Sequence, residues 1–252
     1  TQALSLSLNT VAVRLALEVG PKNVARTAYR LGISSKLDPN ASIALGTSEV
    51  SLTELVGAYA PFANGGRGVA PHVVNRIRTV EGSKVLYARA PDQLGQVVDP
   101  RRVAMMNAMM QETLLSGTAR KAEIPGWPAA GKTGTTQDFR DAWFIGYTAN
   151  LVTGVWLGND DNSPTKKTTG GGLPVEVWTR FMRAAHQNVP VAALPGSQAG
   201  GASNLAQIAS QIVPVTPVPA TGSNRPAPTR AAVRPEAANG LDGWLMERLF
   251  GR

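Results

Sequence analysis

The sequence predicts an α+β domain in which an antiparallel sheet is flanked by helices, and three observations support this fold class. Apolar residues at helical spacing occupy both the beginning and the end of the region before Gln187. β-branched and aromatic runs lie between them, without the strand–helix–strand alternation of a parallel sheet. Beyond Gln187 the composition changes to Pro, Ala, Gly and Ser, so a folded domain is expected over 1–187 with a disordered Pro-rich tail after it.

Four elements are expected in the first 90 residues. They are helices over 4–19, 21–32 and 51–62, and a hairpin that joins 73–79 to 84–87. Within the first helix, Asn9 is positioned to cap a new helical run, because Asn accepts hydrogen bonds from amides two or three residues on. Gly20 ends this helix and Pro21 opens the next. The hairpin prediction depends on Glu81-Gly82-Ser83 between two β-rich runs.

The rest of the domain is expected to contain a helix, three adjacent antiparallel strands and a last helix. They span 99–116, 131–135, 142–147, 151–157 and 175–185. Asp99-Pro100 is a strong helix start, and the short turn at 148–150 favours antiparallel pairing. Each helix has an expected inner face: Val103, Met106, Met110 and Leu114 in one, and Val177, Trp178, Phe181 and Met182 in the other.

The tail is expected to have two parts. Residues 188–240 are a Pro/Ala/Gly-rich linker, since eight of the eighteen prolines follow Gln187. Residues 241–252 are expected to form a short amphipathic helix, because Leu241, Trp244, Leu245, Leu249 and Phe250 recur at helical spacing.

Composition excludes several classes of function. The chain has no cysteine, which removes disulfides, thiolate metal sites and cysteine nucleophiles, and with only His72 and His186 no metal or cofactor is expected. The net charge of +8 suits anionic surroundings, but no Lys/Arg block indicates nucleic acid. No apolar run reaches the about 18 residues that a membrane span needs. Because Thr1 is not a natural start, we expect a fragment whose membrane anchor lies upstream.

Gly126 to Thr133 fits the letters of a phosphate-binding P-loop, G-x-x-x-x-G-K-[ST]. A P-loop leads from a buried strand into a helix, whose N-terminus and loop amides hold the phosphates. Here a polar segment precedes the motif, Pro128 removes an amide from the loop, and β-rich sequence follows Thr135. A P-loop nucleotide hydrolase is therefore a weak alternative.

The other interpretation makes Lys132-Thr133-Gly134-Thr135 a strand at the rim of a cleft. The K-T-G pattern occurs together with S-x-x-K and an S-D-N-like element in penicillin-binding proteins and class A β-lactamases. A lysine there supplies positive charge for a substrate carboxylate, threonine hydroxyls add donors, and glycine leaves room for an extended substrate.

With Ser7-Leu8-Asn9 upstream, the sequence resembles the class A (bifunctional) penicillin-binding proteins over about Gln2 to His186. Other segments similar to the family are 44–50, 58–66, 141–148 and 155–160. The resemblance implies the C-terminal part of a transpeptidase domain with an incomplete penicillin-binding protein/β-lactamase-like fold. It also implies an enzyme at the periplasmic face of the bacterial inner membrane. The implied partners are peptidoglycan stem peptides ending in D-Ala-D-Ala, and β-lactams.

The resemblance also implies roles for individual residues. Ser7 would relay a proton and Asn9 would hold the substrate amide. Lys132, Thr133 and Thr135 would bind the terminal carboxylate, Gly134 would leave room for the substrate, and the Thr135 amide would be an oxyanion donor. Taken alone, Asn9 could be only a helix cap, Ser7 a polar neighbour and Lys132 a surface lysine.

Two departures from the family pattern keep alternatives open. The nucleophile motif S-x-x-K belongs before Ser7, and the six preceding residues do not supply it. Ser163-Pro164-Thr165-Lys166 fits the letters but lies in a turn-like stretch, whereas the motif needs a helical turn. In the Gly170 to Trp178 segment, Val175-Glu176 replaces the expected small residues. A non-catalytic peptidoglycan-binding module therefore remains an alternative to the transpeptidase.

Overall fold

A computed structural model describes residues 1–80, 84–90 and 94–197. The expected C-terminal helix and all but the first ten residues of the expected linker lie outside the described residues. The elements are α1 Gln2–Ser5, α2 Asn9–Val19, α3 Pro21–Arg30, η1 Ala41–Leu45, α4 Leu52–Ala63, β1 Arg76–Arg78, β2 Val85–Ala88, α5 Pro100–Leu115, β3 Ala130–Thr135, η2 Gln137–Phe139, β4 Asp141–Tyr147, β5 Val152–Gly158 and α6 Leu173–Ala185.

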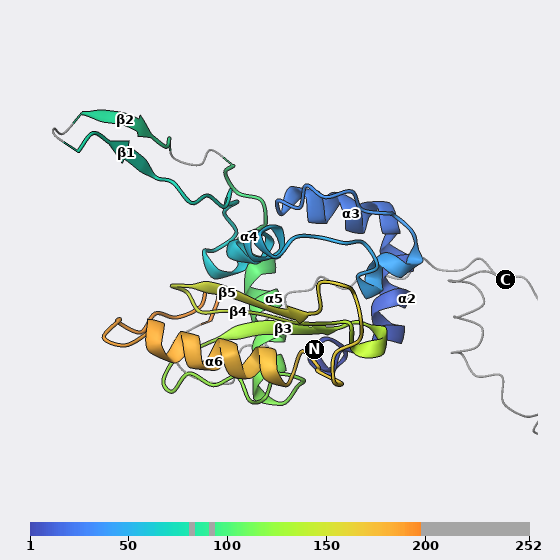
Figure 1. Cartoon of the computed structure of the whole chain (residues 1–252). Coiled ribbons are helices and arrows are strands. Elements are labelled where there is room, and N and C mark those ends of the chain that lie inside the picture. The colour runs from blue at the N-terminus through green and yellow to red at the C-terminus, as the bar shows by residue number, and fades with distance from the viewer. Residues whose placement is uncertain (81–83, 91–93, 198–252) are drawn as a thin grey trace, which may run out of the picture. The chain divides into compact units, whose positions relative to one another are not determined.

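The central sheet has the strand order β3-β4-β5, and both pairings are antiparallel, as predicted (Figure 1). α6 lies against one face, and α4 and α5 lie against the other. Successive side chains of a strand point to opposite faces. Phe144 of β4 therefore packs edge-to-face on Trp178 of α6, whereas Tyr147 packs against Tyr59 of α4 on the other face. The α+β fold class is confirmed.

Gly146 allows α6 to approach the sheet closely. A Cβ added at this position would lie 2.7 Å from the Trp178 ring, which is closer than side chains can approach. Trp178 is fully buried there, and its indole Nε1 donates a hydrogen bond to the Gly146 carbonyl at 3.1 Å. The close contact thus gives a buried polar ring atom its partner.

Two of the four residues predicted to form the inner face of α6 are buried, and the prediction is wrong for the other two. Trp178 and Met182 are fully buried, but Val177 and Phe181 are 42% and 52% exposed. The reason is the helical period of 3.6 residues, which places Val175, Trp178 and Met182 on one face and turns the other two residues away from it. The predicted face of α5 agrees better, since Val103, Met110 and Leu114 are buried and Met106 is partly buried.

Asn9 does not cap a helix, which corrects the prediction. α2 begins at Asn9 itself, with Leu8 at the N-cap position and no side-chain cap. The break falls two residues earlier, at Ser7, whose left-handed φ of 56° separates α1 from α2. The expected helix over 4–19 is therefore two helices, and the side chains of Leu15 and Val19 are more than half exposed.

The N-terminus of α4 has a complete capping box. Ser51 accepts a hydrogen bond from the Glu54 amide, and the Glu54 carboxylate accepts from the Ser51 amide in return. The same carboxylate also accepts from the amides and hydroxyls of Ser34 and Ser35. These hydrogen bonds hold the pKa of Glu54 far below its usual range, the Ser34 hydroxyl contributing most. The cap thus ties the loop after α3 to α4.

The folded domain continues beyond Gln187, where the sequence placed the start of the linker. Leu194 is buried beside Met110 of α5 and Tyr147 of β4. The buried Asn107 amide donates to the carbonyls of Phe62 and Pro195 at 3.0 and 2.9 Å. Proline-rich composition predicts extended chain, but an extended chain with an apolar residue can still pack on a domain.

The expected hairpin is present as β1 and β2, away from the central sheet (Figure 1), and all residues of its two strands are exposed. Among the described helices, none is both long enough and apolar enough to cross a membrane.

Candidate active site

Lys132 lies on β3, at the edge of the described sheet, because β3 pairs only with β4. Its Nζ donates hydrogen bonds to Ser7 Oγ at 2.9 Å and to its neighbour's carbonyl, Thr133 O, at 2.8 Å. Both acceptors are neutral, and partial burial lowers the pKa of Lys132 to about 8 by removing water from the ammonium group. Lys132 is therefore less basic than an exposed lysine. Two of the three N–H donors of its ammonium group are used in these hydrogen bonds, and the third is left for a ligand.

Ser7 reaches Lys132 because α1 packs tightly against the end of α5. A Cβ added at Gly117 would lie 2.3 Å from the Ser5 carbonyl and 2.8 Å from Thr113 Cα, both backbone atoms. The same Ser5 carbonyl accepts a hydrogen bond from the Thr118 amide at 3.0 Å. Gly117 therefore allows a contact that places Ser7 beside β3, although the two residues joined by the Lys132–Ser7 bond are 125 positions apart in sequence.

The threonines of β3 are held by neighbouring segments. Thr133 Oγ1 and Thr118 Oγ1 are 2.6 Å apart, and Thr135 Oγ1 accepts from the Gly170 amide at 2.9 Å. A Cβ at Gly170 would lie 2.4 Å from the carbonyl of Gly134, so the glycine-rich loop lies directly against β3. These contacts fix the hydroxyls on the strand before any ligand binds.

A cleft of about 500 Å³ lies between these segments. It is lined by Ser7, Gly117, Thr118, Arg120, Lys121, Thr133, Thr135, Thr169 and Gly171. Ser7, Thr133 and Thr135 thus line one cleft, and Lys132 is bonded to the first of them without being a lining residue itself. Asn9 is not brought to this lining. Its side chain is exposed and forms no hydrogen bond with another residue of the described chain.

Five lining residues were not predicted from the sequence: Gly117, Thr118, Arg120, Lys121 and Thr169. The expected helix over 99–116 ends just before Gly117, and the sequence between this helix and the P-loop-like motif was described only as a polar segment. A helix that stops at a close-packing glycine is the one signal that could have drawn attention to the segment after it.

The P-loop interpretation fails in the structure. Lys132 and Thr133 lie inside β3, which leads to β4, and no helix begins at the motif. Ser163 and Lys166 lie in the loop after β5, outside any regular helix, so they do not share a helical turn. In the described part of the chain, no group of three His, Asp or Glu side chains is arranged to hold a metal ion.

The solved structures that superpose on this chain include penicillin-binding proteins. PonA1 from Mycobacterium tuberculosis, in complex with penicillin V, superposes with a TM-score of 0.69 at 30% identity, covering 77% of this chain and 58% of that one. Penicillin-binding protein 1A from Haemophilus influenzae gives a TM-score of 0.67 over 77% of this chain and 35% of that one. At 24% identity, this second match supports the fold alone.

The family model for the penicillin-binding protein transpeptidase domain matches residues 1–182, and the chain belongs to this family. Penicillin-binding protein 1A of Neisseria meningitidis is 38% identical over 190 residues, 73% of this chain and 24% of that protein. The protein of the same name from Aquifex aeolicus is 36% identical over 75% of this chain and 26% of its own length. The chain thus spans about a quarter of these relatives. The resemblance to class A penicillin-binding proteins is confirmed.

Proposed function

We propose that this chain is part of a serine DD-transpeptidase that cross-links peptidoglycan stem peptides. Its β3 edge would bind the carboxylate of a D-Ala-D-Ala terminus. The observation that carries the proposal is the Lys132 ammonium. It is partly desolvated, has one donor left over, and is bonded to Ser7 Oγ, which lines a hydroxyl-rich cleft. Family membership supports the reaction class.

The carboxylate would be held by Lys132 with the hydroxyls of Thr133 and Thr135. With a pKa of about 8, Lys132 is mostly charged at pH 7. A charge-assisted hydrogen bond is about twice as strong as a neutral one. The edge of β3 offers unpaired backbone groups to an extended peptide, in the manner of an added strand.

Ser7 would serve as a proton relay between this lysine and the reacting nitrogen. Its Oγ accepts the hydrogen bond from Lys132 Nζ, so its own proton is free to be donated elsewhere. As that proton leaves, Lys132 Nζ would supply its replacement through the same hydrogen bond, and the neutral lysine would take a proton back by the reverse path when the attacking amine is deprotonated. The Thr135 amide would be one oxyanion donor.

The attacking serine is not among the groups that line the cleft. A β-lactam such as the penicillin V bound to PonA1 would occupy the same carboxylate site here, without acylation by a described residue. We expect no covalent labelling when this chain alone is incubated with a fluorescent penicillin. A labelled serine found by mass spectrometry would show that the chain supplies its own nucleophile. The enzyme would work at the periplasmic face of the inner membrane.

Binding to N-acetyl-D-Ala-D-Ala tests the carboxylate site directly, because it needs no nucleophile. NMR titration should give saturable shifts, which are lost when the peptide carboxylate is an amide. Lys132→Gln should weaken binding roughly tenfold to a hundredfold, the usual loss for a charged hydrogen bond. Lys22→Gln on α3 is the matched control and should bind normally. Equal binding by the amide peptide would contradict the proposal.

A non-catalytic peptidoglycan-binding role is the second candidate. It is favoured by one observation, the lack of an S-x-x-K helical turn in the described residues. Sequencing the complete reading frame decides between the two, since an upstream S-x-x-K supports the transpeptidase and its loss supports the binding role.

A further inference from the structure

The cleft continues past β3 to the segment that follows α5. Arg120 and Lys121 line this end, and the rest of the lining consists of hydroxyl-bearing side chains and two glycines. No carboxylate and no large apolar side chain is among the lining residues. A cavity of about 500 Å³ is within the ~300–1,000 Å³ range of small-ligand sites, larger than one carboxylate needs.

Arg120 and Lys121 are exposed, because the residues on either side of them are anchored in the core. Ala119 is fully buried and Ala122 is 5% exposed, both in the core that also contains Trp178. The Ala119 amide donates to the Thr113 carbonyl, and the Ala122 amide donates to the Ala119 carbonyl at 2.7 Å. This tight turn fixes the backbone of the two basic residues, so their side chains start from a rigid base.

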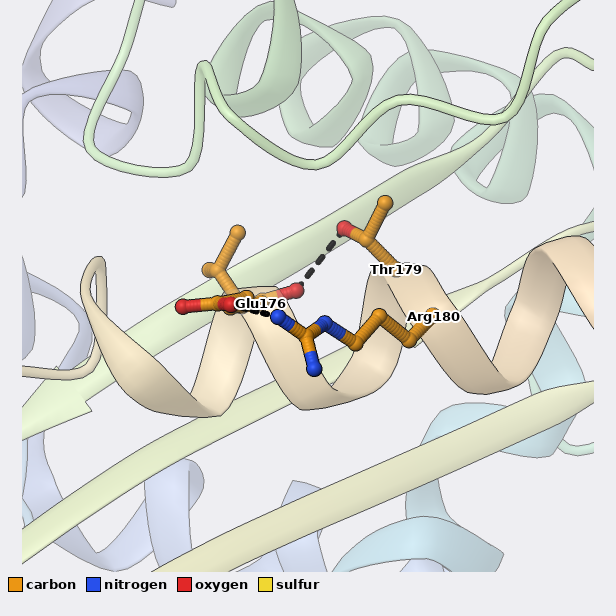
Figure 2. A network of polar contacts seen from close by, with 4 residues as sticks. Glu176, Thr179 and Arg180 are labelled. Carbon is orange, nitrogen blue, oxygen red and sulfur yellow. Dashed lines mark hydrogen bonds and ion pairs between the residues drawn. The ribbon is translucent and has the colours of Figure 1, made fainter.

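Neither cation has an ionic partner in the described residues, and the adjacent surface gives a direct contrast. A neighbouring hollow, also bordered by Lys121, is lined by Arg180 and Arg183 of α6. There Arg180 pairs with Glu176 at 2.5 Å (Figure 2), and Arg183 lies 3.9 Å from Glu123. Figure 2 shows the Glu176–Arg180 pair along one side of α6, so this arginine is already neutralised by its own helix. The cations in the cleft are not.

We propose that Arg120 and Lys121 form a second anion subsite, which takes a further carboxylate on the peptide whose terminal carboxylate is held at Lys132. This inference depends on the proposed function. The ligand class is an extended peptide with at least two carboxylates, one at its C-terminus and one nearer its N-terminal end. Two unpaired cations on a rigid turn would select for that second charge and steer the peptide into the cleft.

Matched pairs of N-acylated D-Ala-D-Ala peptides test the subsite with the whole chain. N-succinyl differs from N-butanoyl by a carboxylate in place of a methyl group, and glutaryl/pentanoyl and adipoyl/hexanoyl pairs extend the spacer. Dissociation constants come from NMR titration at low and high salt. At least one diacid should bind about two- to fivefold more tightly than its partner, as expected for exposed charge pairs. That ratio should fall at high salt.

The double variant Arg120→Gln/Lys121→Gln should reduce the ratio to about one. Arg183→Gln, which alters the paired cation in the neighbouring hollow, should leave the ratio as it is. Circular dichroism checks that both variants fold, which is expected because these side chains are exposed.

Two further outcomes separate the inference from the proposed function. If no diacid binds more tightly than its partner while Lys132→Gln weakens both, the second subsite is wrong and the carboxylate site stands. If Lys132→Gln changes neither affinity, the carboxylate site is wrong and the subsite falls with it. A ratio that persists in the double variant overturns the subsite as well.

Discussion

The cap of α4 and the β3 edge of the cleft each contain a charged side chain bonded to serine, but the two differ in saturation. The Glu54 carboxylate accepts six hydrogen bonds from three serines. Lys132 donates to one serine and one carbonyl, and its ammonium is partly desolvated. Glu54 has little capacity left for a ligand, whereas Lys132 keeps a donor and has lost water. A charged group whose hydrogen bonding is incomplete therefore indicates the binding site, whereas a charged group with saturated hydrogen bonding indicates a structural role.

The charges of Glu54 and Lys132 have opposite effects on the stability of the fold. The pKa of Glu54 is lowered in the fold, so its interactions stabilise the domain above about pH 4.5, and this stabilisation is lost as pH falls through the lowered pKa. The pKa of Lys132 is also lowered, from 10.5 to about 8, but for a lysine this means that burying the charge is unfavourable. That cost is present below pH 8 and is relieved as pH rises toward 10.5.

Gly117→Val should have the largest effect on stability and on peptide binding, because it disrupts the packing that places Ser7 beside Lys132 at the cleft. The added side chain would collide with the backbone at Ser5 and Thr113, and overpacking of this kind costs about 1–3 kcal/mol. Ser7 would also move away from Lys132, so N-acetyl-D-Ala-D-Ala binding should weaken beyond what stability explains. Urea denaturation and NMR titration measure the two effects. Unchanged binding in a folded variant would show that the Ser7 contact is unimportant.

Ser51→Ala should have an intermediate effect, on stability alone. Loss of this N-cap should lower the free energy of unfolding by about 1 kcal/mol at pH 7. Because Glu54 loses the Ser51 hydroxyl as a donor while keeping the backbone amide at this position, the acid midpoint of unfolding should also move to higher pH. Peptide affinity should stay at the wild-type value, since the cap does not line the cleft. A loss of affinity would contradict the division between scaffold and site.

Asn9→Ala should have the smallest effect on stability. The side chain has no capping bond and is exposed, so the change should stay within about 0.5 kcal/mol. A helix cap would instead contribute about 1 kcal/mol. Peptide affinity measured on the same variant tests the role that the family resemblance implies for Asn9. A loss of affinity greater than tenfold would show that Asn9 contacts the substrate, although it lies outside the cleft lining.

The sequence predicted the elements of this domain better than the faces they bury. The three strands, the helix start at Asp99-Pro100 and the place of K-T-G in a strand all depend on local signals, such as turn residues and hydrogen bonding between near neighbours. The exposure of Val177 and Phe181 depends on where α6 meets the sheet, which its composition does not specify. For the same reason the sequence did not predict that Arg120 and Lys121 line the cleft. Their place there depends on the packing of α1 against the end of α5 at Gly117, which is a contact between distant segments.

The pH dependence of N-acetyl-D-Ala-D-Ala binding is the sharpest test of whether Lys132 holds the peptide carboxylate. If the Lys132 ammonium holds the carboxylate, affinity should be constant between pH 6 and 7. It should then fall as pH rises past about 8, where the free lysine loses its proton. Lys132→Gln should bind weakly at every pH and show no such fall. An affinity that stays constant to pH 10, or a fall that persists in Lys132→Gln, would contradict the account.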